Sequence, residues 1–152
     1  MIPRYTRETM GKIWKPKSKF NIWLKTELLV CEALAEKGVI PLQALENIRK
    51  KARFSVRRIE EIEKVVKHDV IAFLENVAEY VGPDSRFIHM GLTSSDVLDT
   101  GFALQLKEAM ELMAEPARAG HAAAEPGVVQ LSFPKFSQPI HDFALPLWKM
   151  PR

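Results

Sequence analysis

The sequence contains a single cysteine, Cys31, in 152 residues. One cysteine cannot form a disulfide within the chain, so a small disulfide-stabilised fold is excluded and a reducing compartment is favoured. Cys31 lies inside an apolar helical pattern. That position predicts a buried, unreactive thiol and not a nucleophile.

The sequence also lacks a long apolar run. No stretch approaches the roughly 18 uninterrupted apolar residues of a membrane helix. The first residues, Met-Ile-Pro-Arg, do not open an apolar segment of the signal-peptide kind. We therefore expect a cytoplasmic protein with no membrane partner.

Charge of one sign is not in large excess, since the net charge is only +3. Basic residues do gather within residues 4–25 and again within residues 49–58. Such clusters are usually solvated faces, so we expect no nucleic-acid partner. The hydrophobic content of 47% in a chain of this length is enough for one domain with a real core.

Apolar residues recur at three- and four-residue spacings, and no convincing strand or internal repeat is present. Helices are predicted over residues 18–37, 41–52, 56–66 and 70–81. In the second of these, one apolar face is predicted to hold Leu42, Leu45, Ile48 and Ala52. Short connections place successive helices side by side, which predicts an all-α fold. Residues 1–17 are expected to form an irregular, basic leader.

A further helix is predicted from about Ser95 to about Met113, with apolar residues on more than one face. That distribution is typical of a helix buried in a bundle or at a subunit interface. Six of the ten prolines come after it, between Pro116 and Pro151, and leave no room for a helix of normal length. We therefore predict a helical domain over residues 1–93, the start of a helical bundle over 94–115 and an irregular tail over 116–152.

The segment from Gly91 to Asp96 combines a glycine turn, small hydroxyl residues and the start of the long helix. Thr93 and Asp96 have the spacing of a capping box, in which side chains satisfy free amides at a helix start. Helix amides and the hydroxyls of Thr93, Ser94 and Ser95 could together bind an anion. A capped helix start without a ligand is the alternative interpretation.

Two other polar segments are candidate site residues. Lys67, His68 and Asp69 precede a dense apolar run. His68 is either a histidine tuned by its charged neighbours or part of an ordinary surface helix start. Arg4 and Tyr5 are either an arm that folds over a site and binds a phosphate or carboxylate, or a packing tyrosine beside a solvated arginine.

Three segments, in this order and spacing, resemble the amino-terminal part of the bacterial adenylosuccinate lyase family, which belongs to the fumarase/aspartase superfamily. They are Pro3–Tyr5, Lys67–Phe73 and Gly91–Val97. The resemblance extends from Met1 to about Met113. It implies a carbon–nitrogen lyase of purine biosynthesis that releases fumarate from adenylosuccinate to give AMP, and that also cleaves the succinyl-carboxamide ribonucleotide intermediate.

The resemblance also implies an enzyme without a metal or a redox cofactor, working as a homotetramer with each site built from several subunits. Arg4 and Tyr5 would contact the nucleotide end of the substrate. Lys67, His68 and Asp69 would line the site, with His68 in an auxiliary catalytic role. Thr93 and Ser94 would hold a carboxylate of the succinyl group.

The chain departs from the family beyond Met113. Family members are much longer, with a general-acid histidine in a Gly-Arg-Thr-His segment and a catalytic serine on a mobile loop. Neither motif is present, and the segment around His121 only faintly echoes the first. We therefore expect a lyase fragment that carries part of one substrate site and is inactive alone. The alternative is a non-enzymatic helical module that docks to a full-length lyase or another partner.

Overall fold

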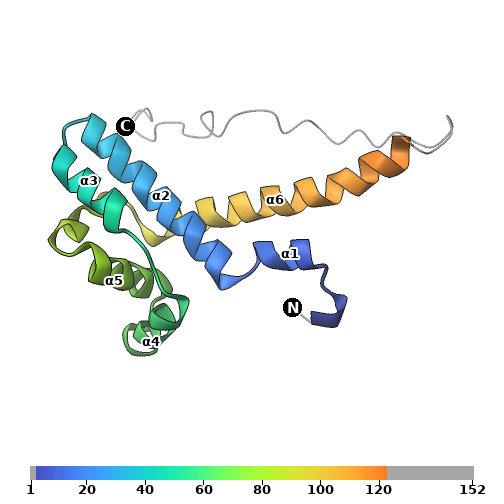
Figure 1. The fold of residues 1–152 in the computed structure, drawn as a ribbon, viewed down its shortest axis with the longest axis horizontal. Coiled ribbons are helices and arrows are strands. Elements are labelled where there is room, and N and C mark those ends of the chain that lie inside the picture. Colours follow the sequence, from blue (N-terminus) through green and yellow to red (C-terminus); the bar gives the residue numbers. More distant parts are fainter. Residues whose placement is uncertain (1–2, 123–152) are drawn as a thin grey trace, which may run out of the picture.

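The computed structural model describes the backbone of residues 3–122 and the side chains of residues 4–114. The elements, in chain order, are η1 (Pro3–Tyr5), α1 (Glu8–Ile13), α2 (Pro16–Glu36), α3 (Leu42–Lys51), α4 (Val56–Val66), α5 (Asp69–Val81), η2 (Pro83–Phe87) and α6 (Ser94–Ala122). No strand occurs within residues 3–122, which confirms the all-α fold class (Figure 1). Over the same residues, no helix has the length and apolar character needed to cross a membrane.

Helix α2 is the centre of the arrangement. It packs against α3 and α4 and also against α6, while α4 and α5 pack on each other. Figure 1 shows α3, α4 and α5 on one side of α2, with α1 and the long α6 extending toward the other. Two of the polar segments noted in the sequence lie at helix ends. Lys67–Asp69 join α4 to α5, and Gly91–Asp96 lead into α6.

An aromatic cluster forms the middle of the core. The rings of Phe20 and Phe73 stack with their centres 5.7 Å apart, and the Trp23 ring meets Phe73 edge-on at 5.6 Å. Phe54 packs against both phenylalanines. Phe73 is fully buried, so this cluster joins α2 to α5 by removing several large apolar side chains from water.

Helix α6 approaches α2 and α1 closely through small and polar residues. A Cβ atom on Gly101 would lie 2.9 Å from the Trp23 indole, so a larger residue would push the helices apart. Gln105, which is buried, donates a hydrogen bond from Nε2 to the backbone carbonyl of Ile13 at 2.7 Å. The first half of α6 is thereby fixed to α1 and α2, and its second half projects beyond them (Figure 1).

The predicted helices within residues 18–81 are confirmed as α2 to α5, but two expectations for the first 52 residues are wrong. The leader is not irregular, because it contains η1 and α1, and Ile13 at the end of α1 is buried. Leu42 does not belong to the core face of α3, since its exposed fraction is 68% and Ala44 is buried instead. Leu42 is the first residue of its helix, at the end of the face that Leu45 and Ile48 bury.

The predicted end of the last helix near Met113 is also wrong, since α6 continues through Pro116 to Ala122. A proline inside a helix removes one hydrogen bond and costs about 3 kcal/mol, but it need not end the helix. Alanines on both sides of Pro116 favour helix strongly. The remainder of the predicted tail, residues 123–152, lies outside the described residues, and the domain boundaries stay a prediction.

Candidate functional site

Thr93 and Asp96 form a cap at the start of α6, as the spacing predicts. The Thr93 backbone N–H donates to Asp96 Oδ2 at 2.7 Å, and its hydroxyl lies 3.0 Å from the same oxygen. These two hydrogen bonds, with a smaller contribution from the charge of His89, lower the pKa of Asp96. The box is incomplete, because the Asp96 N–H donates to the Thr93 carbonyl and not to its hydroxyl.

The cap has a direct consequence for anion binding. The Thr93 hydroxyl already donates to Asp96, so it can donate to a ligand carboxylate only after that bond is released. Ser94, the first residue of α6, is half-buried beside it. The start of α6 can therefore offer hydroxyls and helix amides to an anion, in competition with Asp96.

A buried carboxylate holds the turn that leads into this cap. Glu27, on α2, is 1% exposed and accepts two hydrogen bonds from His89, one from the backbone N–H at 2.8 Å and one from Nδ1 at 2.7 Å. An ionised carboxylate only accepts, so this contact requires a proton on Nδ1. His89 has a φ of 66°, a conformation that non-glycine residues adopt at a cost. The two bonds to Glu27 offset that cost and fix the turn.

Sequence reasoning missed the role of Glu27, because its partner lies 62 positions later. In the sequence, Glu27 lies four residues from both Trp23 and Cys31, on the same face of the helix predicted over residues 18–37. A charged residue on an apolar face needs a buried partner. The position of Glu27 was therefore the sequence signal that such a partner exists.

Cys31 is buried at 1% exposure, and its thiol lies 3.7 Å from the Phe87 carbonyl. Burial, together with the nearby carboxylates of Glu27 and Glu32, raises the pKa of Cys31 to about 11. A thiol with so high a pKa carries almost no thiolate at neutral pH. The predicted burial of Cys31 is confirmed, and its low reactivity stays a prediction.

Alkylation of native Cys31 by iodoacetamide is expected to be very slow at neutral pH and to accelerate only as the pH approaches about 11. Because the pKa is raised from 9.0 on folding, the protonated thiol favours the folded state. That contribution is complete below pH 9 and is lost as the pH rises toward 11. Mass spectrometry of labelling against pH tests this, with the urea-unfolded chain as the reactive control; rapid labelling of the folded chain near neutral pH would contradict it.

Lys67, His68 and Asp69 form the junction between α4 and α5. Lys67 ends α4 in the left-handed conformation, with a φ of 55°. His68 is the N-cap of α5, where Nδ1 accepts from the Ile71 N–H at 3.4 Å, and Asp69 Oδ1 accepts from the Val70 N–H at 2.8 Å. Lys67 and His68 are exposed and Asp69 is half-buried. The segment therefore caps two helices while presenting its side chains to the surface, and a neutral His68 carries its proton on Nε2.

Arg4 and Tyr5 lie in η1 at the start of the described chain. The Arg4 guanidinium lies 4.8 Å from the centre of the Tyr5 ring, a cation–π contact. Tyr5 is 74% exposed, so of the two interpretations of this pair the packing tyrosine is wrong. The pair instead presents a planar cation and an aromatic ring to solvent.

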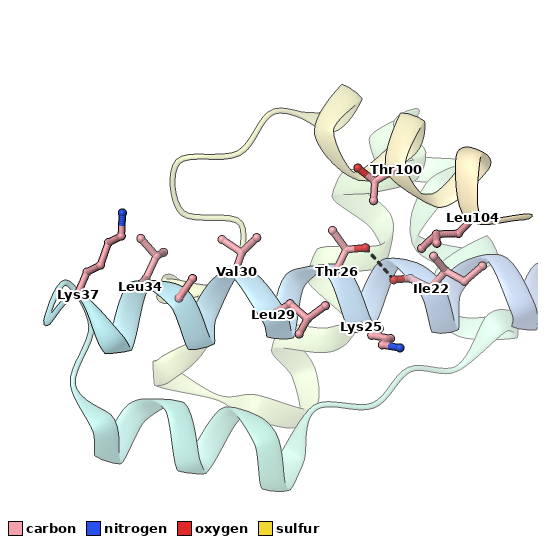
Figure 2. Close-up of a pocket in the computed structure, with 10 residues that line it drawn as sticks. Ile22, Lys25, Thr26, Leu29, Val30, Leu34, Lys37, Thr100 and Leu104 are labelled. Carbon is pink, nitrogen blue, oxygen red and sulfur yellow. Dashed lines mark hydrogen bonds between the residues drawn. The ribbon is translucent and has the colours of Figure 1, made fainter. Parts of the chain in front are cut away.

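These segments do not come together within one chain. Figure 1 shows η1 beyond α1, the α4–α5 pair on the opposite side of α2 and the start of α6 between them. The groove between α2 and α6 (Figure 2) is lined by other residues. Among the described residues, no cluster of three or more His, Cys, Asp or Glu could hold a metal ion.

Comparison with known proteins identifies the relationship. The model of a family described as Lyase matches residues 4–119. The chain belongs to this lyase family. The match extends past Pro116, and so slightly further than the sequence resemblance to Met113 indicated.

Three curated adenylosuccinate lyases are similar to the chain. The enzyme of Synechocystis sp. is 56% identical over 115 residues, which cover 76% of this chain and 27% of that protein. The enzyme of Aquifex aeolicus is 50% identical over 116 residues, and that of Bacillus subtilis is 45% identical over 113; each match covers 74% of this chain and 26% of the relative. The chain thus spans about a quarter of the length of these relatives.

A solved structure shares the fold. The crystal structure of a fumarate lyase from Mesorhizobium sp. BNC1 matches with a TM-score of 0.65 at 22% identity, covering 73% of this chain and 28% of that one. The described helices therefore have the arrangement found in part of a lyase.

Proposed function

We propose that the chain is the amino-terminal part of an adenylosuccinate lyase of the cytoplasm and carries part of its substrate site. The complete enzyme would release fumarate from adenylosuccinate to give AMP, and would cleave the succinyl-carboxamide ribonucleotide in the same way. The observation that carries the proposal is the 45–56% identity with three adenylosuccinate lyases over the same amino-terminal region.

The start of α6 is proposed to bind a carboxylate of the succinyl group through Thr93 and Ser94. β-Elimination removes a proton from the carbon next to a carboxylate, so negative charge builds on that carboxylate in the transition state. Preorganised hydroxyls and helix amides stabilise such charge, and one donor can contribute about 3 kcal/mol. The fixed turn between His89 and the cap supports this role, because it holds the donors in place before substrate arrives.

The other segments are proposed to bind the rest of the substrate. Exposed Arg4 and Tyr5 offer a cation and a ring suited to the nucleotide end. Lys67, His68 and Asp69 would line the site, with His68 acting as an auxiliary group through Nε2. Because these segments lie at separate places on one chain, a site that uses all of them requires several copies, in line with the homotetramer that the resemblance implies (Figure 1).

Purified chain mixed with adenylosuccinate is expected to produce no AMP above the uncatalysed background. The motifs that would supply the general acid and the catalytic serine are absent from the sequence, and without proton transfer the elimination has no efficient route. The measurement is the loss of adenylosuccinate absorbance together with chromatography of AMP. Turnover well above background would contradict the assignment as a partial site.

A chimera tests the positive side of the proposal. Residues 1–119 of this chain would replace the matching segment of the Synechocystis enzyme, and the chimera is expected to keep adenylosuccinate lyase activity within about tenfold of the parent. The parent with the same segment deleted is the control. A folded, tetrameric chimera without activity would show that this segment no longer serves as a substrate half-site.

A second candidate is a non-enzymatic module that docks to a lyase subunit. The observation that favours it is a row of exposed apolar side chains on one face of α6, formed by Phe102, Leu106, Met110 and Met113. Exposed apolar rows of this kind are typical of helix–helix interfaces. Light scattering of the chain alone and mixed with a full-length relative tests docking; a monomer that ignores the relative would exclude it.

A further inference from the structure

A groove runs along α2 on the side that faces α6, apart from the proposed substrate residues. Its volume is about 500 Å³, and Figure 2 shows Thr100 and Leu104 of α6 lying over Ile22 and Thr26 of α2. Its other apolar residues include Leu29, which is 53% exposed. The groove therefore offers a largely apolar surface that is open to solvent.

The groove has few polar side chains. The Thr26 hydroxyl already donates a hydrogen bond to the Ile22 carbonyl at 3.0 Å, so it needs no hydrogen-bond acceptor from a ligand. Lys25 and Lys37 line the groove as well, and Figure 2 shows them at different positions along α2. A matching occupant would be an apolar segment that carries an acidic residue at its edge.

The chain itself contains such a segment outside the described residues. Residues 143–148 read Phe-Ala-Leu-Pro-Leu-Trp and directly follow Asp142, the one acidic residue among residues 126–152. Pro139 and Pro146 restrict the backbone, which lowers the entropy lost when an extended segment binds a groove. The apolar composition of the segment therefore complements that of the groove. Asp142, at one end of the segment, is opposite in charge to the groove lysines, whereas Lys149, at the other end, has the same charge as they do.

The chain between α6 and residues 143–148 is long enough for these residues to reach the groove. From Leu104 to the end of α6 at Ala122, the helix covers about 27 Å at 1.5 Å per residue. Residues 123–142 can extend over as much as about 66 Å at 3.3 Å per residue. The apolar segment can thus return along α6 to the groove without unwinding the helix.

We propose that residues 143–148 of this chain bind in the groove between α2 and α6, with Asp142 facing the lysines at its edge. Leu29 and Leu104 receive the apolar side chains of the segment. The interaction is intramolecular, so it does not depend on protein concentration. It is independent of the proposed lyase function, because no residue of the substrate site takes part.

Tryptic cleavage of the full-length chain after Lys149 provides the test, with cleavage after Lys135 as the internal reference. Binding keeps the segment beside Lys149 out of the protease, so cleavage there depends on the unbound population. Leu29→Glu in the groove and Leu147→Asp in the segment are each expected to raise the ratio of Lys149 to Lys135 cleavage at least about fivefold. Combined, they are expected to give no further increase, because either one already abolishes binding.

Val65→Glu is the matched control, since Val65 is an 80% exposed apolar residue on α4, away from the groove. It is expected to leave the cleavage ratio unchanged, and circular dichroism checks that every variant keeps its helix content. Equal ratios in wild type and Leu29→Glu would overturn the proposal. So would protection that disappears on dilution, which would assign the groove to a second copy.

Discussion

Replacement of Glu27 by alanine is expected to lower the free energy of unfolding by about 3–5 kcal/mol. The change leaves the His89 N–H and ring nitrogen without their acceptor, and it opens a cavity beside α2. It also removes the bonds that hold His89 in its left-handed conformation. Domains of this size are stable by about 5–15 kcal/mol in total, so the loss is a large fraction of the whole. Urea unfolding followed by circular dichroism measures it.

Glu32→Ala is the matched control for Glu27. Glu32 is on the same helix and pairs with Arg49 at 2.8 Å, but both side chains are partly exposed. Solvent screens such a pair, and its removal is expected to cost less than about 1 kcal/mol. Glu27→Gln, which keeps one acceptor oxygen, should fall between the two. Equal losses for Glu27→Ala and Glu32→Ala would show that the buried pair does not hold the turn.

In the chimera with the Synechocystis enzyme, Thr93→Ala combined with Ser94→Ala is expected to reduce kcat/KM at least about 100-fold. Both hydroxyls would be lost from the proposed carboxylate site, where charge develops during elimination. The effect on stability should stay within about 0.5–2 kcal/mol, the usual cost of a lost helix cap. Steady-state kinetics and thermal unfolding of the same samples separate the two effects.

Two variants sharpen this result. Thr93→Ser keeps the hydroxyl and is expected to retain most activity. If Thr93 acted only through the bulk of its methyl group, Thr93→Ser would lose activity as Thr93→Ala does. Thr9→Ala removes an exposed hydroxyl from α1 and is expected to change neither rate nor stability. If the double alanine variant kept kcat/KM within about threefold of the chimera, the proposed carboxylate contact would be excluded.

Much of the fold was predictable, because burial in α2 to α5 obeys helical periodicity. In α4, Ile59 and Ile62 are buried as their spacing requires, and in α5 Val70 and Phe73 are fully buried. Amphipathic segments of this kind encode their own inward face. The start of the chain is different. The end of α1 is fixed by a hydrogen bond from Gln105, which lies 92 residues away in the sequence. No local sequence pattern predicts such a contact.

The candidate site was predictable only in part. Short motifs located Thr93, Asp96 and His68, and the resemblance supplied their proposed roles. The capping geometry was visible in the spacing, because a capping box is a local device. The contact between Glu27 and His89, which holds the turn before the cap, could not be predicted in this way. The two residues meet only after α2 and the turn before α6 have folded together. Under the proposed function, the separate segments combine only when several copies assemble, and no local sequence pattern predicts how the copies pack.

The hydrogen bond between Gln105 and the Ile13 carbonyl also determines when α1 can pack during synthesis of the chain. Ribosomes add roughly 5–20 residues per second, so Gln105 is made roughly 5–20 s after Ile13. During that interval α1 has no partner on α6, and the edge of Trp23 that Gly101 will cover stays uncovered. Until α6 has been synthesised, the nascent chain therefore leaves this apolar edge of Trp23 exposed, and exposed apolar surface is what chaperones bind.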